Sequence, residues 1–410
     1  PTNMNKKTKM KPATSLVHAG RNKSYAKGAV NIPPYRSSTV LFDTLEEYQE
    51  VKHYDAAFQD VVSSRFRYGR LGSPNSFALE EAYSELTSAF SSVATNSGLS
   101  AINIAVSAFL EQGSHALVTQ GAYEPAAELF TKHLGPFGVK TQFISPSIGR
   151  EIYDLILPET KLVYLEAPSS NTFEIPDIDI LVESIRDKSQ ELGTEIVITF
   201  DNTWAGPLYF RPLEHGIDIE ILSATKYVVG HSDAMLGLVA CTEKTYQSVK
   251  NSSKNQGISA EPDACYLGLR GLRTMAIRMQ SQFESTNEVA NWLEKQELVT
   301  EVLYPPLNSS SSHDNWKKYF TGGGSLMSII LDKKYTDSQL AVMLDNMELF
   351  AMGYSYGGFE SLITPCKLQK ERVSGLDQLQ NTIIRLYIGL EDISDLINDL
   401  ESGFNRLKKT

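Results

Sequence analysis

Residues 218–227 read DIEILSATKY, a mostly apolar run that closes on a lysine. Its apolar residues do not strictly alternate with polar ones, since Ile221 and Leu222 are adjacent, which is typical of a strand buried on both faces of a parallel sheet. Ligands of such sheets bind beyond the carboxyl ends of the strands. The stretch therefore predicts a strand that ends in Lys226 and carries its amine to the mouth of a ligand crevice.

Similar apolar runs recur within residues 73–270, and helical patterns separate several of them. The runs are HALVT (115–119), KLVYLEAP (161–168), EIVITFD (195–201) and GLVAC (237–241). The helical stretches include SFALEEAYSELTS (76–88), GLSAINIAVSAFLEQ (98–112) and DIDILVESIRDKSQEL (177–192). This alternation predicts an α/β domain with a mostly parallel sheet and helices on both faces.

The regions on either side of this domain differ from it. Residues 1–72 are rich in turn formers and hold one helical stretch, TLEEYQEVK (44–52), so we expect an N-terminal arm that contacts a neighbouring subunit. Residues 271–410 contain two strand patterns, in 321–332 and 382–392, and close with an amphipathic helix, DISDLINDLESGF. They predict a smaller C-terminal α+β domain.

Composition narrows the class of partner. The chain of 410 residues has 38 basic and 49 acidic residues and a net charge of -11, which argues against a nucleic-acid or membrane partner. No run approaches the roughly 20 apolar residues of a membrane helix, and the N-terminus resembles no secretory signal. Cys241, Cys265 and Cys366 form no CxxC pattern, so neither disulfides nor a metal site are predicted. We expect a cytoplasmic protein that acts on a small molecule.

Asp201 and Lys226 follow two consecutive apolar runs, 25 residues apart. Taken singly, the aspartate is more often a turn former or a helix cap, and the lysine a solvated charge. Together they suit pyridoxal 5′-phosphate (PLP). A desolvated amine is nucleophilic toward the aldehyde of PLP, and the protonated ring nitrogen needs an anionic partner.

A phosphate group needs backbone N–H donors, which a helix N-terminus offers. Ser97, Gly98 and Leu99 open the predicted helix that follows the short strand SVAT (92–95). The hydroxyl groups of Ser223 and Thr225 flank Lys226 and are further candidates for phosphate contacts. Each of these signals is weak in isolation, because ordinary helix capping explains most such sequences.

Longer segments resemble the Cys/Met-metabolism family of PLP-dependent enzymes, and within it the bacterial cystathionine β-lyases. The resemblance runs from about Val17 to Arg406. It implies the aspartate aminotransferase-like fold, fold type I of the PLP-dependent transferases. The matching segments are RYGRLGSP (67–74), GAYEP (121–125), LEAPSSNTFEIPD (165–177), ATKYVVGHSDAM (224–235), RGLRT (270–274), YSYGGFESL (354–362) and TIIRLYIGLEDISDLI (382–397).

The resemblance also implies the roles of cofactor-binding residues. Lys226 corresponds to the lysine that binds the cofactor aldehyde, Asp201 to the partner of the ring nitrogen, and Tyr123 to the aromatic residue stacked on the ring. Tyr68 and Arg70 correspond to residues that reach the phosphate from a neighbouring subunit. The phosphate contacts within the chain would be Gly98, Leu99, Ser223 and Thr225.

Four residues are implied to contact the substrate. Arg385 corresponds to the arginine that binds the substrate α-carboxylate, and Ser355 lies in the matching YSYGG loop. Tyr354 stands where γ-acting relatives tend to carry Glu, which favours β-elimination. Tyr356 stands where β-lyase relatives carry Trp, so the pocket wall and the substrate preference are expected to differ.

Leu99 replaces the usual Met or Ala of the phosphate loop, where only its backbone N–H matters.

The implied activity is cleavage of cystathionine to homocysteine, pyruvate and ammonia, in methionine biosynthesis, by a homotetramer built from dimers that share active sites. Lys226 would be the base at Cα, and Lys226 or Tyr123 the proton donor to the leaving thiolate. Three alternatives stay open: a cysteine or cystine lyase, an amino-acid racemase acting on alanine with Tyr68 or Tyr123 as second base, alone or beside lyase activity, and a PLP-binding regulatory protein without turnover.

Overall fold

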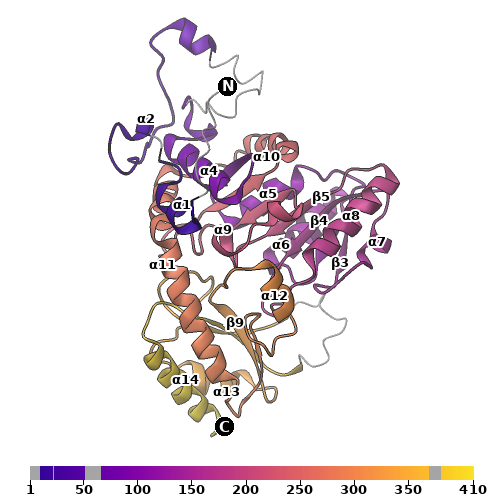
Figure 1. The fold of residues 1–410 in the computed structure, drawn as a ribbon, viewed down its shortest axis with the longest axis vertical. Helices are drawn as coiled ribbons and strands as arrows, with labels where there is room; N and C mark the ends of the chain where they lie inside the picture. The colour runs from indigo at the N-terminus through magenta and orange to yellow at the C-terminus, as the bar shows by residue number, and fades with distance from the viewer. Residues whose placement is uncertain (1–9, 22, 51–65, 369–379) are drawn as a thin grey trace.

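The computed structural model describes residues 10–21, 23–50, 66–368 and 380–410. They form a large sheet and a small sheet, and the long helix α11 (Pro262–Leu293) runs from the large domain into the small one (Figure 1). Within these ranges, no helix combines the length and the apolar character that crossing a membrane requires.

The large sheet has seven strands in the order β1-β7-β6-β5-β4-β2-β3. The pairings from β3 through β2, β4 and β5 to β6 are parallel, whereas β7 runs antiparallel to β6 and β1. This confirms the mostly parallel sheet. Its strands are β1 (Ser91–Thr95), β2 (His115–Thr119), β3 (Lys140–Ile144), β4 (Thr160–Glu166), β5 (Val197–Asp201), β6 (Ile219–Leu222) and β7 (Gly237–Cys241).

Helices cover both faces of this sheet (Figure 1). Among the helices in the described part of the first 256 residues are α1 (Pro12–His18), α2 (Lys23–Ala26), η1 (Gly69–Leu71), α4 (Pro74–Thr87), α5 (Gly98–Ser107), α6 (Glu124–Glu128), η2 (Leu129–Leu134), η3 (Gly135–Phe137), α7 (Ile152–Leu155), α8 (Ile178–Leu192), α9 (Gly206–Tyr209), η4 (Pro212–His215) and α10 (Glu243–Gln256).

Strand β4 explains why the apolar runs do not alternate. Val163 packs into the core formed with α4 and α8, while Leu162 and Tyr164 pack into the core formed with α5 on the opposite face. Both faces are covered, so both sets of side chains are buried and both are apolar or aromatic. The sequence pattern follows from this layering.

The small sheet is antiparallel, with the order β10-β11-β9-β8. Helices α13 and α14 pack against each other, and α11 packs against α14. This confirms the smaller C-terminal α+β unit. Its elements are β8 (Val299–Leu303), α12 (His313–Tyr319), β9 (Leu326–Leu331), α13 (Asp337–Leu344), β10 (Leu362–Cys366), β11 (Ile383–Tyr387) and α14 (Ile393–Leu407).

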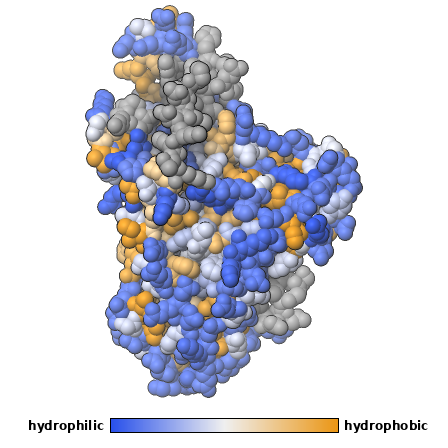
Figure 2. Space-filling model, viewed as in Figure 1, coloured by the Kyte–Doolittle hydropathy of each residue, from blue (hydrophilic) through white to orange (hydrophobic). Residues whose placement is uncertain are grey.

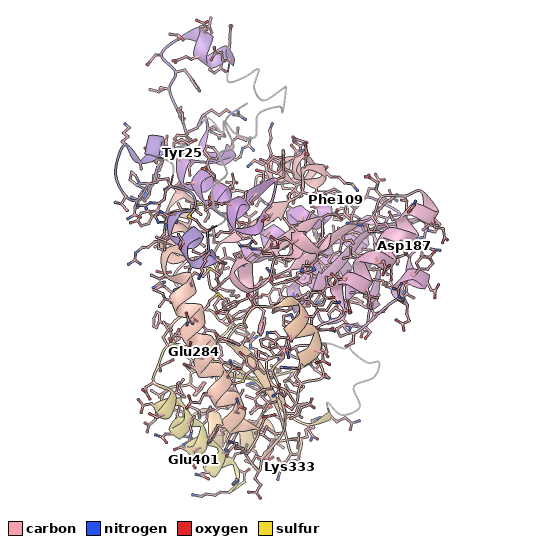
Figure 3. All side chains as sticks on the ribbon, viewed as in Figure 1. Tyr25, Phe109, Asp187, Glu284, Lys333 and Glu401 are labelled. Atoms are coloured by element: carbon pink, nitrogen blue, oxygen red, sulfur yellow. The ribbon has the colours of Figure 1, made fainter. Side chains whose placement is uncertain are left out.

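Side chains fill the space between α11, α14 and the small sheet (Figure 3). The face shown in Figure 2 is mostly hydrophilic, with apolar patches scattered over it. Several large apolar side chains of the N-terminal segment are strongly exposed, among them Val30 (71 %), Leu41 (88 %) and Leu45 (69 %). Exposed apolar residues gathered on one segment are typical of a contact surface, which supports the proposal that residues 1–72 form an intersubunit arm.

One sequence expectation is wrong. Strand β6 ends at Leu222, so Lys226 does not end the strand but lies four residues beyond it. The chain turns there, because the Lys226 N–H donates to Ser223 O (3.1 Å) and the Gly230 N–H donates to Lys226 O (2.8 Å). The lysine therefore projects from a tight turn, which fixes its backbone on both sides.

Two other expectations meet the structure only in part. The predicted domain boundary at residue 270 falls inside α11, so one continuous helix links the two sheets, and the division into domains remains a proposal. Of the predicted helix TLEEYQEVK, residues 45–50 are helical, and the remainder lies outside the described residues.

Candidate active site

Asp201 is the last residue of β5 and is buried. Its Oδ1 accepts hydrogen bonds from the Thr203 N–H (2.9 Å) and the Thr203 hydroxyl (2.5 Å), and its Oδ2 accepts one from the Tyr164 hydroxyl (3.4 Å). Burial raises the pKa of Asp201, while the bonds from Thr203 and Tyr164 and the charge of Lys226 oppose that rise. The carboxylate is thus held in one orientation, and a cation placed against it would stabilise its charge.

Thr203 links the two strand ends of the site. Besides donating to Asp201, its hydroxyl oxygen accepts a hydrogen bond from the Ser223 N–H (2.9 Å). One hydroxyl therefore sets the position of the carboxylate after β5 relative to the turn after β6. Sequence reasoning missed Thr203, although an Asp-x-Thr pattern after a strand is a known turn signal.

Lys226 meets the loop that contains residues 354–358. Its Nζ donates to the Ser355 hydroxyl (2.5 Å) and lies 5.1 Å from the centre of the Tyr356 ring. Burial and the positive charge of Arg385 lower the pKa of Lys226 to about 8, against the opposing effect of Asp201. A large share of the lysine is therefore the neutral, nucleophilic amine at mildly alkaline pH.

The YSYGG loop is shaped to lie directly on the lysine. Gly357 has φ +90°, and a Cβ there would come within 2.6 Å of the Lys226 Cα. Only glycine permits both that conformation and that close approach. Ser355 also has a positive φ of 77°, which is uncommon for a residue with a side chain. The Tyr356 ring packs edge-on against Tyr227 and at a tilt against Tyr387.

The N-terminus of α5 packs against the turn that carries Lys226. Ser97 caps this helix by accepting from the Ser100 N–H (3.1 Å). A Cβ on Gly98 would lie 2.6 Å from the Ser223 Oγ, so the absence of a side chain lets the first turn meet Ser223. Leu99 follows in the same turn and is 41 % exposed. The N-terminus of α5 and the Ser223 hydroxyl thus lie next to each other, and both are groups that can bind a phosphate.

Thr225 is engaged differently from Ser223. Its hydroxyl donates to Leu236 O (3.1 Å) and accepts from the Leu236 N–H (2.9 Å). Among the described residues no hydrogen bond of the Ser223 hydroxyl is found. Of the two predicted hydroxyl contacts, Ser223 is the better placed donor, while Thr225 holds the lysine turn against the segment before β7.

Tyr123 and Arg385 reach the site from different domains. Tyr123 precedes α6, and its N–H donates to the Glu166 Oε2 (2.7 Å). Glu166 ends β4 in register with Asp201. Burial and Glu166 raise the pKa of the Tyr123 hydroxyl, and Arg385 opposes them. Arg385 lies on β11 between Ser328 and Thr364.

Tyr354 and the pair Tyr68 and Arg70 are not brought to Lys226 within the chain. Tyr354 is fully exposed. Arg70 lies beside the end of α10, where its Nη1 donates to Lys254 O (3.0 Å), and its guanidinium lies 5.7 Å from the centre of the half-exposed Tyr68 ring. Their predicted role in a neighbouring subunit remains a proposal.

Glu220 lies on β6 and is a buried acid that sequence reasoning also missed. Its Oε1 accepts from the Tyr83 hydroxyl (2.9 Å) and from the Asn202 amide (2.9 Å). In the described part of the chain, the Glu220 Oε2 and the Asn202 Oδ1 are both buried without a hydrogen-bond partner. Burial raises the pKa of Glu220 to about 7. When Glu220 is protonated on Oε2, that oxygen becomes a hydrogen-bond donor. The Asn202 Oδ1 is an acceptor that lacks such a donor.

This cluster predicts a pH-dependent stability. Because the pKa of Glu220 is raised in the folded state, its contribution is fully present below the unfolded pKa of about 4.3 and is lost as the pH rises to about 7. The loss should be about 3 to 4 kcal/mol, at about 1.4 kcal/mol per pH unit. Glu220→Gln, whose amide is a permanent donor, should be more stable than the parent near pH 8 and equal to or below it near pH 4. Denaturant unfolding at several pH values measures this.

The matched control for this prediction is Glu401→Gln on the exposed face of α14. It should leave the pH dependence of the unfolding free energy unchanged. If Glu220→Gln follows the parent across the same pH range, Glu220 titrates normally and the assignment of a bound proton is wrong.

The described residues fit the expected cofactor. They supply an amine of lowered pKa on Lys226, a buried carboxylate on Asp201 that accepts bonds from Thr203 and Tyr164, and the N-terminus of α5, where Gly98 leaves no room for a side chain. Tyr123 adds an aromatic ring at the start of α6. Within the described ranges there is no group of three or more His, Cys, Asp or Glu residues that could hold a metal ion.

Comparison with known proteins agrees with this geometry. A sequence model of the family described as Cys/Met metabolism PLP-dependent enzyme matches residues 13–405. Cystathionine β-lyase MetC of Escherichia coli (strain K12) is 40 % identical over 397 residues, which cover 96 % of this chain and 98 % of that protein.

Two further similarities show how broad the set of relatives is. The L-alanine/L-glutamate racemase of Wolbachia pipientis wMel is 35 % identical, over 97 % of this chain and 98 % of its own length. The crystal structure of cystathionine γ-synthase from Xanthomonas oryzae pv. oryzae, in complex with aminoacrylate and cysteine, superposes with a TM-score of 0.85 at 28 % identity, covering 98 % of this chain and 100 % of that one.

Proposed function

Because the chain belongs to the Cys/Met metabolism PLP-dependent enzymes, we propose that it is a carbon–sulfur β-lyase that cleaves cystathionine with water to homocysteine, pyruvate and ammonia. Its cofactor is pyridoxal 5′-phosphate. The observation that carries the proposal is the Lys226 amine, which donates to the Ser355 hydroxyl and whose pKa is lowered by burial and by the charge of Arg385.

When bound, PLP supplies an aldehyde that joins to amines and a ring that withdraws electrons from the substrate Cα. Lys226 would hold the aldehyde, and Asp201 would pair with the ring nitrogen. The Tyr123 ring would stack on the cofactor. Gly98, Leu99 and Ser223 would bind the phosphate, and we propose that Tyr68 and Arg70 of a neighbouring subunit complete that contact.

Lys226 is suited to move the proton that the reaction requires. Its amine accepts the proton from the substrate Cα, because burial and Arg385 keep it partly neutral. Ser355 accepts a hydrogen bond from Nζ and so fixes where the amine points. The thiolate of homocysteine then leaves from Cβ, and Lys226 or Tyr123 donates the proton that neutralises it. One lysine thus serves as base at Cα and as a donor near Cβ.

The decisive test is the set of products that the purified PLP-loaded enzyme forms from cystathionine. β-Cleavage gives pyruvate and homocysteine, whereas γ-cleavage gives a four-carbon keto acid and cysteine. Parallel assays with cystine and cysteine rank the sulfur substrates. Pyruvate formed faster from cystine than from cystathionine would overturn the preferred substrate, and absence of both keto acids would overturn the lyase proposal.

A racemase is the second candidate, supported by the relative at 35 % identity and by a second acid–base group, Tyr123, on another element beside the site. Burial raises the pKa of the Tyr123 hydroxyl, which keeps it protonated and able to return a proton. Chiral analysis after incubation with L-alanine, in the same enzyme preparation, decides between lyase activity alone and a bifunctional enzyme.

Arg385 is expected to control substrate binding. The structure leaves its guanidinium without a hydrogen-bonded partner among the described residues, and its charge reaches Lys226. Arg385→Ala should raise KM by roughly 10²-fold or more, because a charge-assisted bidentate contact is lost. Arg385→Lys should recover only part of it, since an ammonium cannot form the two parallel bonds. An unchanged KM in Arg385→Ala would exclude this role.

We also propose that the active form is a cytoplasmic homo-oligomer of methionine biosynthesis, with dimers that share active sites. The exposed apolar residues of the N-terminal segment support this. Mixing two inactive variants, one altered at Tyr68 and one at Lys226, should restore part of the activity only if each site draws on two subunits.

A further inference from the structure

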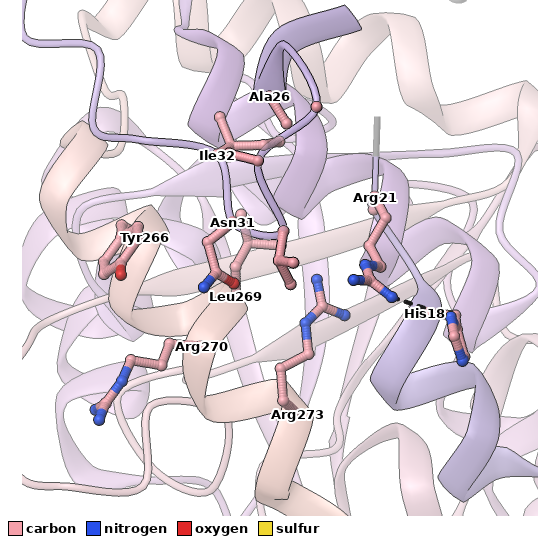
Figure 4. A pocket seen from close by; sticks show the side chains of 13 residues that line it. His18, Arg21, Ala26, Asn31, Ile32, Tyr266, Leu269, Arg270 and Arg273 are labelled. Carbon is pink, nitrogen blue, oxygen red and sulfur yellow. Dashed lines mark hydrogen bonds between the residues drawn. The ribbon is translucent and has the colours of Figure 1, made fainter. Parts of the chain in front are cut away.

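A cavity of about 440 Å³ lies between the N-terminal segment and the first turns of α11 (Figure 4). None of the predicted active-site residues lines it. Its volume is within the range of small-molecule sites, roughly 300–1,000 Å³. Its walls combine apolar side chains, such as Ile32 and Leu269, with three arginines, Arg21, Arg270 and Arg273, and the imidazole of His18.

The charges of this cavity are unbalanced. No aspartate or glutamate is among its lining residues, although the whole chain has a net charge of -11. Elsewhere in the described chain, arginines such as Arg36, Arg150 and Arg186 each pair with a carboxylate. The cavity is therefore a local concentration of positive charge that the protein does not neutralise itself.

Two of the arginines come close to each other. Arg273 extends from α11 toward Arg21, as Figure 4 shows, and burial, with a smaller effect from the charge of Arg21, lowers the pKa of Arg273. Arg273 donates through Nη1 to Leu16 O and Ala19 O (both 2.9 Å), which fixes the guanidinium in place. Two like charges held together from two segments repel one another unless an anion lies between them.

Most N–H groups of Arg21 and Arg270 have no hydrogen-bond partner among the described residues. Arg21 has one hydrogen bond, to the His18 Nδ1 (3.3 Å). Among the described arginines, only Arg270 and Arg385 have side chains that make no hydrogen bond, and Arg385 is the one proposed to bind a substrate carboxylate. The side chains of Asn31 and Tyr266 add neutral polar groups to the same wall. The arrangement is complementary to a molecule with one or more oxyanion groups and a small apolar body.

We propose that this cavity binds a small organic oxyanion, a carboxylate or a phosphate, between Arg21 on the N-terminal segment and Arg270 and Arg273 on α11. The bound anion joins the two segments, because its oxygens accept from guanidinium groups on both. The cavity is lined by none of the proposed active-site residues, so its occupancy is measured as binding and not as turnover.

The test uses the full chain loaded with PLP and titrates citrate, and separately inorganic phosphate, by calorimetry at constant ionic strength. Absorbance of the cofactor is followed in parallel, so that phosphate displacing PLP is not counted as binding. We expect saturable binding with one site per chain. Citrate alone giving a signal identifies a carboxylate site, and a signal with both identifies a general oxyanion site.

Variants decide where the anion binds. Arg21→Gln and Arg270→Gln should each weaken binding about tenfold or more, because each removes charge-assisted hydrogen bonds. Arg150→Gln, which removes an exposed arginine outside the cavity, is the control and should change the affinity by less than about twofold. Arg273 is left intact, because its bonds to Leu16 and Ala19 also hold α1.

Two results would overturn the proposal. One is the absence of saturable binding for both citrate and phosphate in the parent protein. The other is binding that Arg150→Gln weakens as much as Arg21→Gln does, which would reflect only the general charge of the surface. Since turnover is not the readout, failure of the lyase proposal would leave this test unaffected.

Discussion

Replacing Lys226 by alanine is expected to abolish turnover and the absorbance of covalently held cofactor. The reason is that one amine has two tasks, to hold the aldehyde and to accept the Cα proton. Loss of a general base alone costs about 10²–10⁴ in rate, and loss of covalent attachment adds to that. The lysine lies in a turn fixed by backbone bonds to Ser223 and Gly230, so the backbone should keep its shape without the side chain.

The measurement compares pyruvate release and the cofactor spectrum of Lys226→Ala with those of Lys132→Ala, which removes an exposed lysine of η2. Adding a small primary amine to Lys226→Ala should return part of the rate, because it can replace the missing base in the vacated space. Turnover of the parent's magnitude in Lys226→Ala would disprove the assignment.

The layers of the fold could be predicted from the sequence because burial of a strand on both faces leaves a pattern within that strand's own residues. Consecutive apolar residues in KLVYLEAP indicate burial on two faces, and the structure places Val163 and Tyr164 on opposite sides of β4. The position of Asp201 at the end of β5 was predicted for the same reason. The end of β6 was not, because SATK has no strong turn former and its turn is fixed by contacts with Thr203 and Leu236.

The parts of the site that the sequence did not reveal depend on contacts between distant segments. Gly357 packs against the Lys226 backbone although the two residues are 131 positions apart in the sequence. No local sequence pattern around either residue predicts this contact. The roles of Tyr123 and Arg385 came from a resemblance and not from spacing. Glu220 shows no signal at all, since a single acid in an apolar run is informative only once its burial beside Asn202 is known.

Replacing Asp201 by asparagine is expected to lower kcat by roughly 10²–10⁴-fold while the protein stays folded. The asparagine Oδ1 can still accept both hydrogen bonds that Thr203 donates, so the geometry of the strand end is retained. What is lost is the negative charge, which favours the protonated ring that withdraws electrons from Cα. Since Asp201 is not expected to touch the substrate carboxylate, KM should change much less than kcat.

Two further variants make this result specific to the charge. Thr203→Val keeps the carboxylate but removes its hydroxyl donor, and should lower kcat by only about tenfold. Asp187→Asn, on the exposed face of α8 at the far edge of the large domain (Figure 3), makes the same chemical change away from the site and should behave as the parent. Because all three are assayed with saturating PLP, weaker cofactor binding cannot account for the loss.

A kcat for Asp201→Asn within tenfold of the parent would mean that another group supplies the negative charge. Glu166, in register with Asp201 at the end of β4, would then be the residue to replace next.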